Sequence, residues 1–229
     1  MGIVARQSIK ASISNYLGVL IGFAALLYFY PLFFSPTEYG AMRLLLELGA
    51  VLGSFGLLGT TYSINRFFPY FKNPPHHNGF FFWVFALPLI GYFLSLTGLI
   101  TFETNFIKLF KNDTQYIHLI FPMLLVLVLF MMLQTVTETA SSNHGRISIP
   151  NFIREVFIRS SILGLSYLFY IKTIDFQLFC WLIVGIYLFA FILSVIYLRT
   201  LTPISLKPNF EFFKLNPQVK TDIVKFTSW

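Results

Sequence analysis

The residues that could do chemistry in this sequence are a few charged side chains inside or beside long apolar runs. Because a charge is costly to bury in apolar surroundings, such residues usually pair with one another or line the path of a substrate or an ion. The candidates for lining a substrate cavity are Arg43, Glu47, Arg66, Glu138, Arg154 and Arg159. Since arginine pairs well with phosphate oxygens, this set would support the binding of a charged or sugar-bearing substrate.

Most of these residues also have a plainer explanation, which the sequence leaves open. Arg43 and Glu47 are four residues apart and share one helix face, so they either meet the substrate or form a structural ion pair between helices. Arg66, Arg154 and Arg159 lie at the inner ends of predicted helices. There they either bind a pyrophosphate or simply follow the usual excess of basic residues on the cytoplasmic side.

A short polar patch surrounds the remaining candidate. It consists of Gln134, Thr135, Thr137 and Glu138, near the inner end of a predicted helix. This patch either lines a cavity or marks the membrane interface.

No enzymatic signature accompanies these residues. The sequence has no phosphate-binding loop, no paired histidines on a helix, no carboxylate cluster and no nucleophile elbow. Cys180 is the single cysteine, and the adjacent His76 and His77 lack further ligands at metal-binding spacing. We therefore predict neither an enzyme nor a bound cofactor or metal.

The elements that must position the charged residues are membrane-spanning helices. Hydrophobic residues make up 56% of the chain, charged residues only 11%, and the mean hydropathy is +0.73. A soluble domain usually has about 25% charged residues. Since a spanning helix needs roughly 20 apolar residues, we predict an all-α polytopic membrane protein with six spans. The predicted spans are 16–34, 44–64, 80–100, 117–135, 152–171 and 176–198.

The fifth predicted span is unusual because it includes Arg154, Glu155 and Arg159. Each charge at the centre of a span costs about 2.5–3.5 kcal/mol on insertion scales. Glu155 and Arg159 stand four residues apart with the acid first, which is the favourable order for pairing on a helix. We expect this pairing to reduce the cost of insertion.

The basic residues predict the orientation. With the N-terminus in the cytoplasm, twelve of the sixteen lysines and arginines lie inside and three outside, with Arg43 near the outer end of the second span. Both termini are then cytoplasmic. The net charge of +7 reflects topology rather than nucleic-acid binding. We divide the chain into a six-helix lobe (1–198), a basic cytoplasmic linker (199–220) and the start of a seventh helix (221–229).

The first 70 residues carry a familiar order of motifs. These are Gln7-Ser8-Ile9-Lys10, the turn Ser35-Pro36-Thr37-Glu38-Tyr39-Gly40, the helix end Leu57-Leu58-Gly59, and Asn65-Arg66-Phe67-Phe68-Pro69. This order resembles the polysaccharide and O-antigen repeat-unit flippases of the MATE-like exporter superfamily. The match is clearest over residues 1–72, and the spacing of the later helices is similar as well.

The resemblance implies a transporter in the bacterial cytoplasmic membrane that moves undecaprenyl-pyrophosphate-linked oligosaccharide for polysaccharide biosynthesis. Members have two six-helix lobes around a central cationic cavity, and by position Arg43, Arg66, Arg154 and Arg159 are candidates for its charge. This chain matches the N-terminal lobe alone. We therefore expect a fragment, a truncated reading frame or a half-size transporter, whose partner is the missing C-terminal lobe or a second copy.

Two other functions compete with the flippase. A drug or cation antiporter of the same superfamily would carry acidic residues deep in the first span, and there are none between Tyr16 and Phe34. A non-transporting membrane scaffold would tolerate the loss of every intramembrane charge.

Overall fold

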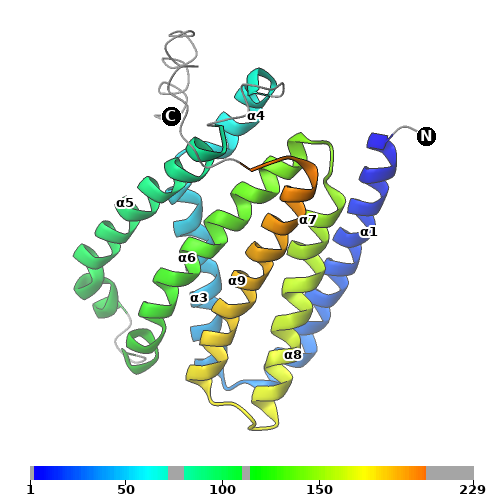
Figure 1. Ribbon diagram of the computed structural model, residues 1–229. Coiled ribbons are helices and arrows are strands. Elements are labelled where there is room, and N and C mark those ends of the chain that lie inside the picture. The colour runs from blue at the N-terminus through cyan, green and yellow to red at the C-terminus, as the bar shows by residue number, and fades with distance from the viewer. Residues whose placement is uncertain (1–2, 72–79, 110–113, 205–229) are drawn as a thin grey trace.

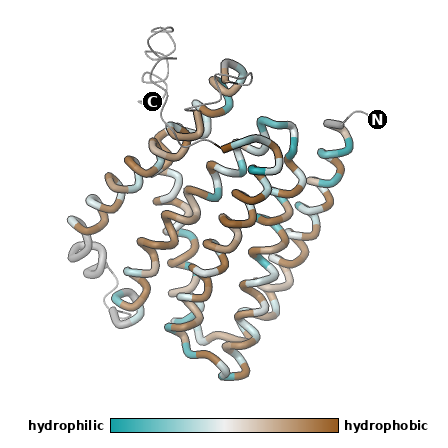
Figure 2. The backbone as a smooth tube through the Cα atoms, viewed as in Figure 1, coloured by the Kyte–Doolittle hydropathy of each residue, from teal (hydrophilic) through white to brown (hydrophobic). Residues whose placement is uncertain are grey.

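The computed structural model describes residues 3–71, 80–109 and 114–204, which are helical with short turns and contain no strand. The helices lie roughly side by side in a bundle (Figure 1). Their side chains are predominantly apolar along the bundle, and polar residues gather toward its ends (Figure 2). Most of the predicted linker and the predicted start of a seventh helix lie outside the described residues. Since α9 extends to Leu201, the predicted last span continues slightly beyond residue 198.

The first helical rod is longer than predicted. It comprises α1 (Ile3–Ala24), a π-helical turn η1 (Ala25–Phe29) and α2 (Tyr30–Phe33), which follow one another directly. Pro31 lies just beyond the π turn, and a proline lacks the N–H that a regular helix needs, so the wider turn is found where the α-helical ladder is interrupted. The predicted span 16–34 is the second half of this rod.

The motif at Ser35 starts the next helix, α3 (Pro36–Gly56). Glu38 donates its backbone N–H to Ser35 Oγ at 3.4 Å, and Ser35 N donates to Glu38 Oε2 at 2.9 Å. Together with Pro36 in the first helical turn, these contacts form a capping box that satisfies two free backbone donors. The break between the first two helices is confirmed at Ser35, but Pro36 to Gly40, which we placed in the turn, already belong to α3.

The second predicted span, 44–64, is bent. After α3 the backbone takes positive φ angles at Leu58 (45°) and Gly59 (67°), and α4 (Thr60–Phe71) leaves at 49° to α3. The predicted span ends at residue 64, whereas the helix continues through Asn65 to Phe71. Pro69 is tolerated because it lies in the last turn of α4.

The remaining helices come in chain order after residue 79. They are α5 (Phe80–Leu109), α6 (Thr114–Asn143), α7 (Ser148–Phe152), the π-helical turn η2 (Ile153–Phe157), α8 (Ile158–Tyr170) and α9 (Phe176–Leu201). A short turn joins α8 to α9, as predicted, and Asp175 caps α9 by accepting the Leu178 N–H at 3.1 Å.

The count of six spans is not confirmed. Within the described residues, four helical segments are long and apolar enough to cross a membrane: Ala5–Phe33, Phe80–Thr101, His118–Asn143 and Phe176–Leu201. The bent pair of α3 and α4 makes a fifth if both parts belong to one span. The predicted span 152–171 does not qualify, because Arg154, Glu155 and Arg159 fall within every window of spanning length in the rod from α7 to α8.

Helix α6 lies at the centre of the packing and contacts α3, α4, α5 and α9. Gly49 and Gly53 of α3 face Leu127, Met131 and Met132 of α6, so the small residues do permit close approach of two helices. Helix α1 lies at the edge of the bundle (Figure 1) and packs mainly against α7, η2 and α8. Its other sides expose large apolar residues such as Leu20 and Phe23, which suits a lipid environment.

Candidate functional site

An open cleft lies between α3 on one side and η2 with the start of α8 on the other. Its volume is about 250 Å³, and α6 and α9 form its base. The lining residues are Ala50, Gly53, Ser54, Leu57, Met131, Gln134, Thr135, Glu138, Arg154, Ile158 and Tyr187. The cleft therefore combines an apolar surface with two charged groups and one amide, as ligand sites commonly do.

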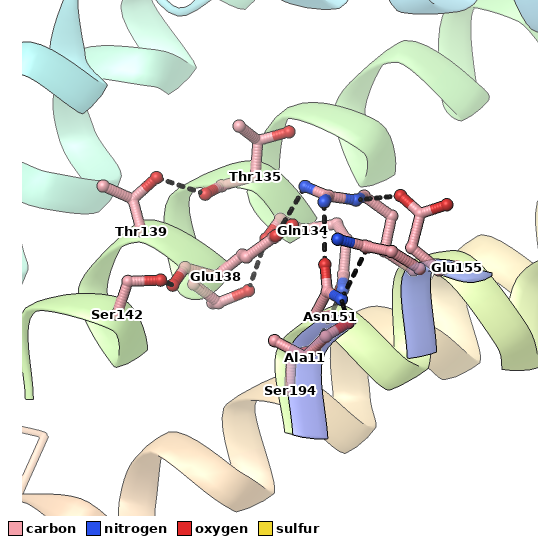
Figure 3. A network of polar contacts seen from close by, with 12 residues as sticks. Ala11, Gln134, Thr135, Glu138, Thr139, Ser142, Asn151, Glu155 and Ser194 are labelled. Carbon is pink, nitrogen blue, oxygen red and sulfur yellow. Dashed lines mark hydrogen bonds and ion pairs between the residues drawn. The ribbon is translucent and has the colours of Figure 1, made fainter. Parts of the chain in front are cut away.

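The charged residues at the cleft form an alternating chain of ion pairs. Arg154 Nη1 lies 2.5 Å from Glu138 Oε1 on α6, and Arg154 Nε lies 2.9 Å from Glu155 Oε1. Arg159 Nη2 then lies 2.7 Å from Glu155 Oε2, so the predicted pair of Glu155 and Arg159 is confirmed. In Figure 3, Glu138 and Glu155 approach from two different helical segments, and dashed lines mark their ion pairs with the guanidinium group of Arg154 between them. We call Glu138, Arg154, Glu155 and Arg159 the charge network.

The carboxylates of the network are more enclosed than its guanidinium groups. The side chains of Glu138 and Glu155 are each 14% exposed, whereas those of Arg154 and Arg159 are 50% and 41% exposed. Removing one partner of such a pair leaves a charge that is poorly hydrated, which typically costs more than the pair itself contributes. Both acids therefore depend on Arg154.

Asn151 connects the network to the first rod. Its Oδ1 accepts from Arg154 Nη2 at 2.9 Å, while its Nδ2 donates to Asn15 Oδ1 at 2.8 Å and to Ala11 O at 2.9 Å. Farther toward the N-terminus of α1, the backbone N–H of Ser148 donates to Gln7 Oε1 at 3.2 Å. Gln7, part of the first motif in the sequence, thus helps to hold α7 against α1.

Close packing of α1 brings the network into place. A Cβ atom added at Gly18 would lie 2.7 Å from the backbone oxygen of Glu155, and one added at Gly22 would lie 2.9 Å from Arg159 Nη1. Arg159 also donates from Nη1 to the Gly18 carbonyl at 2.9 Å. Gly18 and Gly22 are not among the residues singled out from the sequence, although their spacing of four residues on an apolar helix was the available signal.

The π-helical turn η2 carries two members of the network, Arg154 and Glu155. Such turns occur often at functional sites, because the extra residue changes the direction of the side chains around it. In η2 the consecutive residues Arg154 and Glu155 contact each other directly at 2.9 Å.

Gln134 is the most enclosed polar residue of the cleft, at 4% exposure. Its Nε2 donates to Ser194 Oγ of α9 at 3.0 Å. Within the described part of the chain, Gln134 Oε1 has no hydrogen-bond partner. Since a buried amide oxygen is normally paired, this atom marks a place where a donor is missing.

The structure brings three of the six candidate residues together and leaves three elsewhere. Glu138, Arg154 and Arg159 belong to the network. Arg43 and Glu47 pair within α3, with Arg43 Nη2 2.9 Å from Glu47 Oε1, and their side chains are 44% and 65% exposed.

The pair of Arg43 and Glu47 is therefore an intrahelical one, as the spacing allowed, and does not join two helices. Neither residue lines the cleft, but Glu47 shares an exposed face of α3 with the cleft residues Ala50 and Ser54. Arg66 is exposed on α4 beyond the bend, 6.0 Å from the centre of the Phe67 ring, and is not part of the cleft lining.

The described residues contain no group of three or more histidine, cysteine, aspartate or glutamate side chains placed to hold a metal ion. Comparison with protein-family models, with curated proteins and with solved structures gives no match to this chain.

Proposed function

We propose that this chain is one lobe of a membrane flippase that moves an undecaprenyl-pyrophosphate-linked oligosaccharide across the bacterial cytoplasmic membrane. The observation that carries the proposal is the open cleft with its charge network, inside a bundle whose helices are suited to a membrane. Charged residues in such surroundings generally face a substrate path or one another, and here Arg154 lines the cleft and pairs with two carboxylates.

The motifs in the first 70 residues add support from the sequence. In the resembling flippases, a turn of the type found at Ser35 joins the first two helices. In this chain that segment forms a capping box that begins α3, the helix that forms one wall of the cleft. The motif thus has a structural role in setting one side of the proposed transport path.

The proposal includes six spans with both termini in the cytoplasm. The rod from α7 to α8 is then the fifth crossing, and the pairing of its charges reduces the cost of placing them in the membrane. Alternating access requires a second body that moves relative to the first. A C-terminal lobe or a second copy of this chain would supply it.

The test is complementation in cells that carry the gene. After deletion of the gene, we expect loss of surface polysaccharide and accumulation of its lipid-linked precursor on the cytoplasmic side. The intact chain should restore the polysaccharide if it works as a half-size transporter, and otherwise the chain together with the second lobe should restore it.

The variant R154Q should fail to restore the polysaccharide at normal protein level. The matched control is R146Q, because Arg146 is an exposed arginine in the turn before α7 and does not line the cleft. Normal surface polysaccharide after gene deletion would refute the flippase. Full activity of R154Q would instead favour a scaffold role.

A further inference from the structure

The formal charges of the network at the cleft cancel. Arg154 faces Glu138 and Glu155, and Arg159 faces Glu155, so two guanidinium groups balance two carboxylates. Three of the five N–H groups of Arg154 already donate, to Glu138, Glu155 and Asn151, so a phosphate could take only the two that remain. It would meet a guanidinium group whose charge two carboxylates already share, which weakens the attraction.

The polar atoms that the cleft does offer are mainly acceptors. Glu138 and Gln134 lie one turn apart on α6 and both line the cleft. Gln134 Oε1 lacks a donor among the described residues, and the last torsion of a glutamine side chain turns easily. The atom is enclosed in the structure, so a donor bound in the cleft satisfies it once the amide turns and gives up the bond from Nε2 to Ser194.

The hydroxyl groups of the cleft wall already use their protons within their own helices. Ser54 Oγ donates to Ala50 O at 2.9 Å, and Thr135 Oγ1 donates to Met131 O at 3.0 Å. Their oxygens remain able to accept. The cleft thus favours a ligand that is rich in O–H or N–H donors, which an ionised phosphate is not.

The rest of the lining suits the same ligand. Tyr187, Leu57 and Ile158 give the cleft an apolar surface beside its acceptors. A sugar ring presents hydroxyl donors at its edge and C–H groups on its faces, so it matches both parts. Aromatic and aliphatic side chains with a few convergent polar groups are the usual lining of a small-molecule site.

From this we propose that Gln134 and Glu138 bind hydroxyl groups of a glycosyl unit, so that the cleft recognises the sugar of a lipid-linked substrate and not its phosphate. The inference rests on the proposed function, because it takes the cleft to be part of the transport path. It adds Gln134 as a specificity-determining residue.

The test measures binding of two lipid probes to the full chain in phosphatidylcholine nanodiscs by titration calorimetry. Farnesyl β-D-glucoside carries a sugar without phosphate, and farnesyl pyrophosphate carries phosphate without sugar. Both have the same hydrocarbon chain but head groups of different charge, so the partition of each probe into nanodiscs without protein is measured and subtracted. We expect the glucoside to bind at least about tenfold more tightly than the pyrophosphate, the ratio expected for one hydrogen bond.

Variants then assign the effect to the amide oxygen. Q134M keeps the length of the side chain but removes the acceptor, and should weaken glucoside binding about tenfold without changing pyrophosphate binding. S194A is the matched control, because it removes the partner of Gln134 Nε2 and leaves Oε1 in place. Glucoside binding by S194A should stay within about threefold of the unaltered chain, since only a bond outside the ligand contact is lost.

Several results would overturn the inference. Tighter binding of the pyrophosphate, or equal weakening of both probes by Q134M, would show that the cleft does not select the sugar. If Q134M lowers stability but leaves glucoside binding unchanged, a fixed water satisfies the amide instead. Should the glucoside fail to bind while surface polysaccharide still requires Arg154, the proposed function stands and this inference fails. If neither probe binds and gene deletion has no effect, both fail.

Discussion

Removal of the Arg154 guanidinium should destabilise the bundle by leaving the enclosed Glu138 without its counter-ion and Glu155 with Arg159 alone. In the variant R154Q, Glu138 loses a contact of 2.5 Å and Glu155 loses one of 2.9 Å. Breaking a fully buried pair typically costs 3–5 kcal/mol. Since the Arg154 side chain is 50% exposed, water can replace part of its interaction, and we expect a loss of about 2–3 kcal/mol.

Comparison with a double variant separates the ion pair from other effects of the substitution. E138Q keeps the shape of the side chain and removes its charge, so R154Q/E138Q no longer contains an enclosed, unpaired acid at position 138. We expect the double variant to be more stable than the sum of the single losses by about 1–2 kcal/mol, within the usual range for residues in contact.

The measurement is the free energy of unfolding of each variant in bicelles, by steric trapping, under conditions in which the unaltered chain unfolds reversibly. R146Q again serves as the control and should stay within about 0.5 kcal/mol of the unaltered chain, as surface substitutions usually do. Single losses that add to the double loss within about 0.5 kcal/mol would show that Arg154 and Glu138 are energetically independent. That result would refute our account of the network.

Two further predictions concern the packing of the helices that hold the cleft. In G18A the new methyl group would meet the backbone oxygen of Glu155, so we expect the free energy of unfolding to fall by about 1–3 kcal/mol. The control is G164A, at a position with open space on α8, which should be neutral or slightly stabilising. Equal effects of the two substitutions would contradict the close approach of α1. S35A removes the acceptor of the capping box on α3 and should lower the free energy of unfolding by about 1 kcal/mol in the same assay. T37A leaves the two bonds of the box in place, so it should lower the free energy of unfolding by less than half as much.

The sequence predicted those features that depend on residues close together in the chain. Apolar runs marked the long helices, and the spacing of Ser35, Pro36 and Glu38 marked the start of α3. The pairs Arg43–Glu47 and Glu155–Arg159 followed from the helical repeat. In each case the deciding contact lies within one helical turn.

The contacts that build the cleft could not be predicted in this way, because they join segments distant in the sequence. Glu138 meets Arg154 across the turn between α6 and α7, and Arg159 meets Gly18 from a different rod. Hydropathy reports burial in lipid but not which helix lies beside which. The bend after α3 was missed for another reason: Leu58 adopts a positive φ angle that its residue type does not suggest.

The charge network also shows how an apolar bundle can hold four charges. Four unpaired charges at the centre of a span would cost roughly 10–14 kcal/mol on insertion scales, which is comparable to the entire unfolding free energy of a typical domain. Pairing within the network lowers this cost, but only while every member has its partner. The two acids on α6 and η2 share Arg154, so Arg154 is the member whose loss affects the most contacts. The same arrangement neutralises the cleft, and for that reason we expect its selectivity to come from hydrogen-bond acceptors rather than from positive charge.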